Sequence, residues 1–179
     1  RVVTVGHRVT HGRPPTRRPT QPAAGCGMND PIIVGIDPGK TGAIAALDNK
    51  GALLWVEDMT DLTGLGIGSW LAERLDGELV RVCWVEQVHA MPKQGVTSVF
   101  TFGAGYGALL GALGALGIRT KLVTPNVWKR AARLSSDKTA SRQRAAELWP
   151  ADAHLFRRVK DDGRAEACLI AEHGRLQLP

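Results

Sequence analysis

Four carboxylates stand where their type and spacing could support metal-ion chemistry. Asp37 and Glu86 each end a short apolar segment, while Asp162 and Glu166 are four residues apart and precede an Ala/Leu-rich run. Carboxylate oxygens are the ligands that Mg²⁺ prefers in proteins. Two ions about 3.5–4 Å apart can activate an attacking water and stabilise a leaving oxygen. Two strand-end acids together with a helical acid pair therefore predict a two-metal phosphodiesterase site.

Each of these acids also has an ordinary explanation when it is considered alone. Asp37 opens an Asp-Pro-Gly turn, and Glu86 can be a solvated strand end. Either Asp161 or Asp162 can cap the last helix, where the helix dipole favours an acid. Capping leaves Glu166 unexplained, although residues i and i+4 share a helix face. The combination indicates a metal site more specifically than any single motif does.

The segment after the first apolar run also resembles a P-loop, which requires the pattern G-x-x-x-x-G-K-[ST]. Gly39-Lys40-Thr41 matches the end of this pattern, but the first glycine would have to stand at Val34. Gly35 is one residue too late, and a phosphate cradle depends on the length of its loop. We therefore interpret the glycines as allowing a phosphate backbone to approach the acid closely.

The elements that must position these acids follow from the hydrophobic pattern. Apolar and β-branched runs predict strands over 32–36, 42–47, 52–56, 80–85 and 118–123. The first three are joined by short turns, which predicts an antiparallel meander. Helical periodicity predicts helices over 61–76, 96–116, 125–132, 137–148 and 161–174. This order predicts an α/β ribonuclease H-like fold, with a five-stranded mixed sheet of three antiparallel strands and then parallel strands, flanked by helices.

From about residue 32 to its end, the sequence resembles the RuvC-like Holliday-junction resolvases, particularly short phage-type members. That family opens on a strand ending in D-x-G, has a Glu at the end of the fourth strand and finishes with an acid pair on a helix. The matching residues are Asp37, Glu86, Asp162 and Glu166. Many members space the pair i, i+3 and end it on Asp. Here Gly163 lies three residues before Glu166, so Asp162 is assigned and Asp161 remains the alternative.

The resemblance implies a metal-dependent endodeoxyribonuclease that hydrolyses phosphodiester bonds in Holliday junctions or other branched DNA, as in recombination and repair. It implies two Mg²⁺ ions, with Mn²⁺ able to substitute, bound by the same four acids as catalytic and metal-binding residues. The family's proline and two lysines ahead of a helix are matched by Pro125, Lys129 and Lys138. Lys129 and Lys138 are therefore the favoured DNA-binding residues. Lys93 and Arg142 are further candidates, with an ordinary solvated surface as the alternative for each.

Glycines recur at helical spacing at Gly103, Gly107 and Gly111. A glycine costs a helix interior about 1 kcal/mol relative to alanine, so this stripe predicts close contact with another surface. The resemblance implies a homodimer, which suits a two-fold-symmetric junction cut at two positions. Packing on the chain's own sheet is the alternative. Phe100 and Phe102 either stack on splayed bases or belong to the core.

Charge and composition divide the chain near residue 28. Residues 1–27 hold five arginines, four prolines and no acid, whereas the remainder is nearly neutral although the whole chain carries a net charge of +6. We expect residues 1–27 to be a disordered basic extension that precedes a start at Met28, and residues 28–179 to be the nuclease domain. The alternative is that the extension is a genuine DNA-binding tail.

The three cysteines have neither metal-ligand spacing nor an even count, which indicates a reducing, cytoplasmic setting. No uninterrupted apolar run reaches the roughly 18 residues of a membrane span, so we expect no membrane partner. Two other functions share parts of the pattern. An actin-like or sugar-kinase-type nucleotide-binding protein also begins with strand, D-x-G and strand, but it needs two such domains. A non-catalytic branched-DNA-binding module is disfavoured because all four acids are present.

Overall fold

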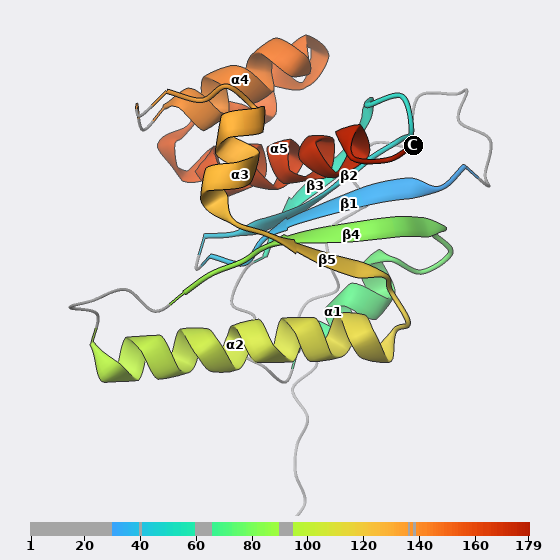
Figure 1. Ribbon diagram of the computed structural model, residues 1–179, viewed down its shortest axis with the longest axis vertical. Coiled ribbons are helices and arrows are strands. Elements are labelled where there is room, and N and C mark those ends of the chain that lie inside the picture. The colour runs from blue at the N-terminus through green and yellow to red at the C-terminus, as the bar shows by residue number, and fades with distance from the viewer. Residues whose placement is uncertain (1–29, 40, 60–65, 90–94, 136, 138) are drawn as a thin grey trace, which may run out of the picture.

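Helices cover both faces of one five-stranded sheet in the computed structural model, with α3, α4 and α5 on one face and α1 and α2 on the other (Figure 1). The structure describes residues 30–39, 41–59, 66–89, 95–135, 137 and 139–179. The strands are β1 (Ile32–Asp37), β2 (Ala43–Leu47), β3 (Leu53–Asp58), β4 (Val80–Glu86) and β5 (Thr120–Val123). The α-helices are α1 (Ile67–Arg74), α2 (Val96–Ala115), α3 (Pro125–Ala131), α4 (Ala140–Leu148) and α5 (Asp162–Leu176).

The strand order β3-β2-β1-β4-β5 confirms the predicted mixed sheet. β1 pairs antiparallel with β2 and parallel with β4, and β4 pairs parallel with β5. Ile36 lies opposite Val85 in the parallel pair. Asp37 and Glu86 are the next residues along these two strands, so the register brings both predicted acids to the same edge of the sheet.

Strand alternation sends both acids to the face that α5 covers. Ile32, Val34 and Ile36 belong to the core on the α1 and α2 side, while Ile33 belongs to the core on the α5 side. Successive side chains of a strand point to opposite faces, so Asp37 shares the face of Ile33. On β4, Val82 and Trp84 belong to the α5-side core, and Glu86 follows in the same alternation.

Two glycines let α5 approach the first strand and its turn closely. A Cβ at Gly35 would collide with the backbone of Ala167 and Ala171, and a Cβ at Gly163 would collide with the Thr41 carbonyl oxygen. The helix backbone therefore lies directly against β1. This contact fixes the start of α5, and with it the predicted acid pair, beside the end of the strand that carries Asp37.

Helix α2 packs by its C-terminal half and leaves much of its surface exposed. Leu109 and Leu113 are its buried residues, whereas Phe100 is 76% exposed. A Cβ at Gly103, Gly107 or Gly111 would meet no atom of the described chain within 4 Å. The stripe therefore does not pack on the chain's own sheet, which removes that alternative.

Helix α2 is also the longest apolar helix among the described residues. By length and composition this helix is apolar enough to cross a membrane, with a mean hydropathy of 1.4 and 11% of its 18-residue window buried. One such helix among the described residues is weak evidence for a membrane span, so the expectation of no membrane partner is not overturned. The same α2 carries the exposed glycine stripe, and its C-terminal half is anchored in the core.

Two short 3-10 helices, η1 (Pro150–Phe156) and η2 (Val159–Asp161), precede α5 and were not predicted. Residues 1–27, Lys93 and Lys138 lie outside the described residues, as does the beginning of the helix predicted over 61–76. The other predicted elements occur within a few residues of their expected bounds.

Candidate functional site

Asp37 is one of three carboxylates whose negative charges repel one another. Its side chain is mostly buried, and one of its oxygens, Oδ1, accepts the Gly39 backbone N–H at 3.0 Å. Burial, together with the negative charges of Glu166 and Glu86, raises the pKa of Asp37 from 3.8 to about 7, against the lowering effects of Gly39 and Lys129. The structure therefore brings together three of the four predicted acids, from β1, β4 and α5.

Glu86 is held by an aromatic donor that the sequence analysis did not identify. The Trp128 Nε1–H donates to Glu86 Oε2 at 2.7 Å, and the Trp128 side chain is fully buried. Burial raises the pKa of Glu86, and Glu166 raises it further, whereas the bond from Trp128 and the charge of Lys129 lower it. The sequence feature that could have pointed to Trp128 is its position directly before Lys129, which was already a candidate DNA-binding residue.

Glu166 contacts a cation and a hydroxyl group. Lys129 Nζ lies 3.1 Å from Glu166 Oε1, and the same oxygen accepts the Ser141 hydroxyl at 3.1 Å. Lys129 comes from α3 and Ser141 from α4, so three helices meet at this carboxylate. Ser141 is almost fully buried, and no feature of the sequence distinguished it from a core-facing helix residue.

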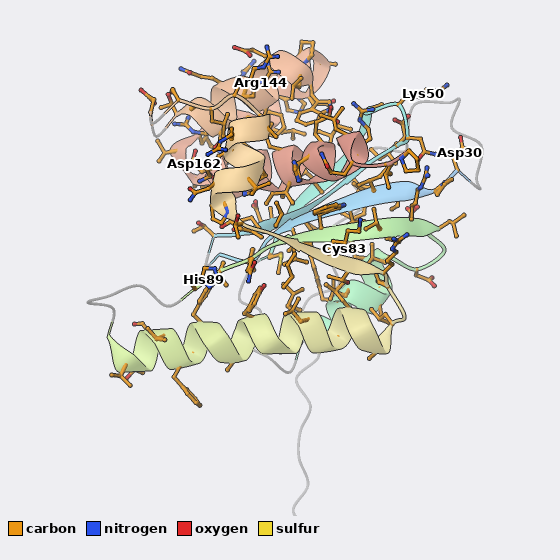
Figure 2. The ribbon with its side chains drawn as sticks, in the orientation of Figure 1. Asp30, Lys50, Cys83, His89, Arg144 and Asp162 are labelled. Carbon is orange, nitrogen blue, oxygen red and sulfur yellow. The ribbon has the colours of Figure 1, made fainter. Side chains whose placement is uncertain are left out.

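The structure separates the roles of the two adjacent acids at the start of α5. Asp161 is 1% exposed, and its carboxylate accepts both the Arg158 backbone N–H and the Arg158 guanidinium, which closes η2 as a cap. Asp162 is the first residue of α5, and its Oδ1 accepts Arg142 Nε at 2.6 Å. Figure 2 shows Asp162 on the side of the molecule where His89 follows the end of β4, away from Asp30 and Lys50.

The cations near these acids are mostly engaged in ion pairs. Arg142, predicted to bind DNA, is only 14% exposed in its side chain and pairs with Asp162. Lys129 is 42% exposed and pairs with Glu166. Arg164 makes two bonds of 2.6 Å to Asp58 at the end of β3, which ties the first turn of α5 to the sheet. Long-range pairs of this kind leave no local signal in the sequence.

The donor set fits a hard divalent cation, although its side chains are not in a coordinating arrangement. All four acids offer oxygen ligands, and the mutual repulsion of three of them is what a cation would relieve. Within the described part of the chain, no three acidic, histidine or cysteine side chains converge as a metal site. Each carboxylate instead faces a protein donor: the Gly39 N–H, the Trp128 indole, Lys129 with Ser141, and Arg142.

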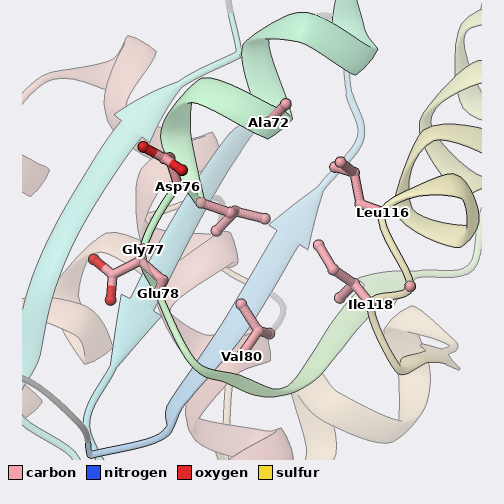
Figure 3. Close-up of a pocket in the computed structure, with 9 residues that line it drawn as sticks. Ala72, Asp76, Gly77, Glu78, Val80, Leu116 and Ile118 are labelled. Atoms are coloured by element: carbon pink, nitrogen blue, oxygen red, sulfur yellow. The ribbon is translucent and has the colours of Figure 1, made fainter.

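A separate pocket of about 440 Å³ lies at the other ends of the strands (Figure 3). Leu75, Val80 and Ile118 contribute its apolar lining, and Asp76 and Glu78 are on its rim. Val80 begins β4, whereas Glu86 ends it. The three acids Asp37, Glu86 and Glu166, called the acid group below, are thus remote from this pocket and lie where the carboxyl ends of β1 and β4 meet.

The sequence matches no protein-family model and no curated protein. The structure of T. thermophilus RuvC in complex with a Holliday junction substrate matches with a TM-score of 0.63 at 18% identity, over 82% of this chain and 96% of that chain. A further Thermus thermophilus RuvC structure gives 0.58 at 20%, over 81% and 96%. The large terminase nuclease from thermophilic phage G20c gives 0.51 at 13%, over 81% and 82%.

These likenesses and the strand order define the class: the chain has a ribonuclease H-like fold. Within this class, the two RuvC structures match with higher TM-scores than the terminase nuclease does. The resemblance to RuvC expected from the motifs is thereby confirmed for the fold.

Proposed function

We propose that this protein is a divalent-metal-dependent endonuclease that hydrolyses phosphodiester bonds in Holliday junctions or other branched DNA. The observation that carries the proposal is that Asp37, Glu86 and Glu166, from three elements, lie near enough for their negative charges to repel one another, with the pKa of Asp37 raised to about 7. Burying like charges together is costly unless a cation binds them. The fold shared with RuvC, which was solved with a Holliday junction, supports branched DNA as the substrate.

In this proposal Asp37, Glu86, Asp162 and Glu166 hold two Mg²⁺ ions, with Mn²⁺ able to substitute. When bound, such ions supply an activated water and charge stabilisation for the leaving oxygen. Asp162 is preferred to Asp161 because the Asp161 carboxylate is buried and committed to Arg158. The Gly39 N–H holds Oδ1 of Asp37 in place, and no hydrogen bond from the described residues engages its Oδ2, which we assign to a cation.

The same proposal assigns phosphate contacts to Lys129, Lys138, Arg142 and Lys93. Lys129 and Arg142 lie at the acids, so a phosphate brought to the reacting position would lie within their reach. Exposed Phe100, near the start of α2, is available to stack on a base. The buried, unpaired thiols of Cys83 and Cys168 fit a reducing compartment such as the cytoplasm.

A homodimer completes the proposed enzyme, because two matched cuts across a two-fold junction require two metal sites. The exposed glycine stripe of α2 is the surface that we assign to the interface, since small residues allow backbones to approach closely. Association of α2 with a membrane is the competing use of this apolar surface. Sedimentation with and without lipid vesicles separates the two uses.

The test is incubation of the purified protein with labelled four-way junction, fork and linear duplex, in Mg²⁺ and in EDTA. We expect Mg²⁺-dependent cutting of the branched substrates in preference to linear duplex. Junction binding without cutting under any divalent ion would instead indicate a non-catalytic branched-DNA-binding module. ATP turnover without DNA cleavage would favour the nucleotide-binding alternative.

A matched pair of variants on α5 assigns the activity to the acid group. Glu166→Gln removes a charge from the group, and we expect cleavage to fall about a thousandfold or more while junction binding is kept. Glu172→Gln makes the same chemical change further along α5, where Glu172 pairs with Arg175 through two bonds of 2.7 Å. Equal losses in both variants would show that the effect is on folding and not on the proposed site.

A further inference from the structure

Trp128 occupies an unusual position for a core aromatic, because its one polar atom reaches the acid group. It lies in α3, whose start is set by the sheet: Glu86 is opposite Val123 in the β4–β5 pair, and α3 begins at Pro125. The first turn of α3 therefore passes over the end of β4. The Nε1–H of Trp128 meets Glu86 Oε2 at 2.7 Å, across 42 residues of sequence.

We propose that Trp128 is a positioning residue that fixes the carboxylate of Glu86 for cation binding. The indole is fully buried among α5-side core residues, including Ala145 and Ala165, so packing determines where its N–H points. A bond of 2.7 Å to an ionised oxygen is short and strong. The bond engages Oε2, and no hydrogen bond from the described residues engages Oε1. Holding Glu86 in this way removes rotamer freedom in advance, which a free glutamate would lose on binding a metal.

The charge around Trp128 supports the same role. Lys129 Nζ lies 5.0 Å from the centroid of the Trp128 ring and 3.1 Å from Glu166 Oε1. The indole therefore donates its Nε1–H to Glu86, and its ring lies beside the cation that pairs with Glu166. Any movement of the indole would disturb both carboxylates. Burial of the indole therefore holds these carboxylates in place, and it also packs the core.

The inference rests on the proposed function for the use of the site, but its deciding measurement, the ion affinity, needs no DNA. Trp128→Phe keeps an aromatic ring and removes the N–H. We expect the Mg²⁺ and Mn²⁺ affinities, measured by calorimetry on the full chain, to fall about 10- to 100-fold. In cleavage assays, kcat should fall while the KM for junction DNA stays near its original value, because phosphate contacts are retained.

Trp149→Phe is the matched control. Trp149 is also buried, and its Nε1–H donates to the Gly51 carbonyl oxygen at 2.9 Å, away from the acid group. Both substitutions therefore remove one buried indole hydrogen bond. We expect the control to lower thermal stability by a comparable amount and to leave ion affinity unchanged. A comparable loss of ion affinity in both variants would overturn the positioning role.

A measurement on the unsubstituted protein keeps the proposal testable even if Trp128→Phe does not fold. The chain has five tryptophans, so NMR spectra of ¹⁵N-labelled indole groups contain few signals. The Trp128 signal is assigned with Trp128→Phe or, if that variant does not fold, by elimination with variants of the other four tryptophans. We expect this signal to shift on Mg²⁺ addition, and not to shift in Glu86→Gln. A Trp128 signal unmoved at saturating Mg²⁺ overturns the inference.

The two proposals fail in different ways. If the protein cuts no DNA yet Mg²⁺ shifts the Trp128 signal and Trp128→Phe weakens ion binding, the nuclease assignment fails and the positioning role stands. If the protein cuts junctions and Trp128→Phe binds Mg²⁺ as tightly as the original chain, the positioning role alone is wrong.

Discussion

Replacing Asp37 by Asn should stabilise the metal-free protein while abolishing cleavage. Asn keeps the shape of the side chain and an oxygen that can accept the Gly39 N–H. It removes the negative charge that burial and the charges of Glu166 and Glu86 disfavour. Stability and activity should therefore change in opposite directions, which is characteristic of a residue retained for chemistry and not for folding.

The magnitude follows from the pKa of Asp37. Raising it from 3.8 to about 7 disfavours the ionised form in the folded protein by about 4 kcal/mol. Because the folded protein binds this proton more tightly than the unfolded chain, the free energy of unfolding falls as pH rises from about 4 to about 7 and is then level. The amide of the Asp37→Asn variant does not titrate, so the advantage of the variant should be near zero at about pH 4 and up to about 4 kcal/mol at about pH 8.

The assay is urea denaturation of both proteins in EDTA at a series of pH values, repeated in Mg²⁺. A bound ion stabilises the folded state, so Mg²⁺ should recover the stability of the original protein at about pH 8 and help Asp37→Asn much less. The control is Asp48→Asn, whose carboxylate accepts the Lys50 and Ala52 backbone N–H groups at 2.8 Å in the turn after β2. A stability difference for Asp37→Asn that is constant with pH would refute the electrostatic reasoning.

Two further predictions concern the rest of the chain. Gly107→Leu should keep or slightly raise the melting temperature, because a side chain there meets open space and leucine favours the helix by up to about 1 kcal/mol. Sedimentation should nevertheless show that this variant is a monomer, and cleavage assays should show that it no longer makes paired cuts. Unfolding of Gly107→Leu, or a monomeric original protein on junction DNA, would contradict the interface. A chain starting at Met28 should fold and cut as the full chain does, whereas weaker DNA binding that low salt restores would show that the five preceding arginines neutralise phosphates.

The fold could be predicted because its strands are short, apolar segments and the lengths of their connections allow few strand arrangements. Gly35 and Gly163 are instructive, since the sequence analysis interpreted the glycines around Asp37, Gly35 among them, as room for a phosphate backbone and gave Gly163 no packing role. In the structure both are sites where α5 contacts the backbone of β1 or its turn. Their role depends on which helix crosses which strand, and residue types alone do not specify that crossing.

The acids of the candidate site could be predicted for the same reason: strand ends and i, i+4 spacing are local properties. Their partners could not. Trp128 in a short apolar stretch has the pattern of a core residue, and its hydrogen bond to Glu86 joins two segments that become neighbours only through β5. The helices η1 and η2 were missed because neither has the periodicity of a longer helix.

Lys129 and Arg142 show how the structure changes the meaning of a correct observation. The sequence identified both as cations near the site, and we assigned them to phosphate contacts. In the structure they pair with Glu166 and Asp162 at 3.1 and 2.6 Å. The Lys129 ammonium has three N–H donors and the Arg142 guanidinium has five, so each can contact a phosphate while it stays paired. A phosphate that draws either side chain away frees its carboxylate for another cation. Wherever a phosphate displaces one of these two ion pairs, we expect DNA binding and cation binding at these acids to favour each other.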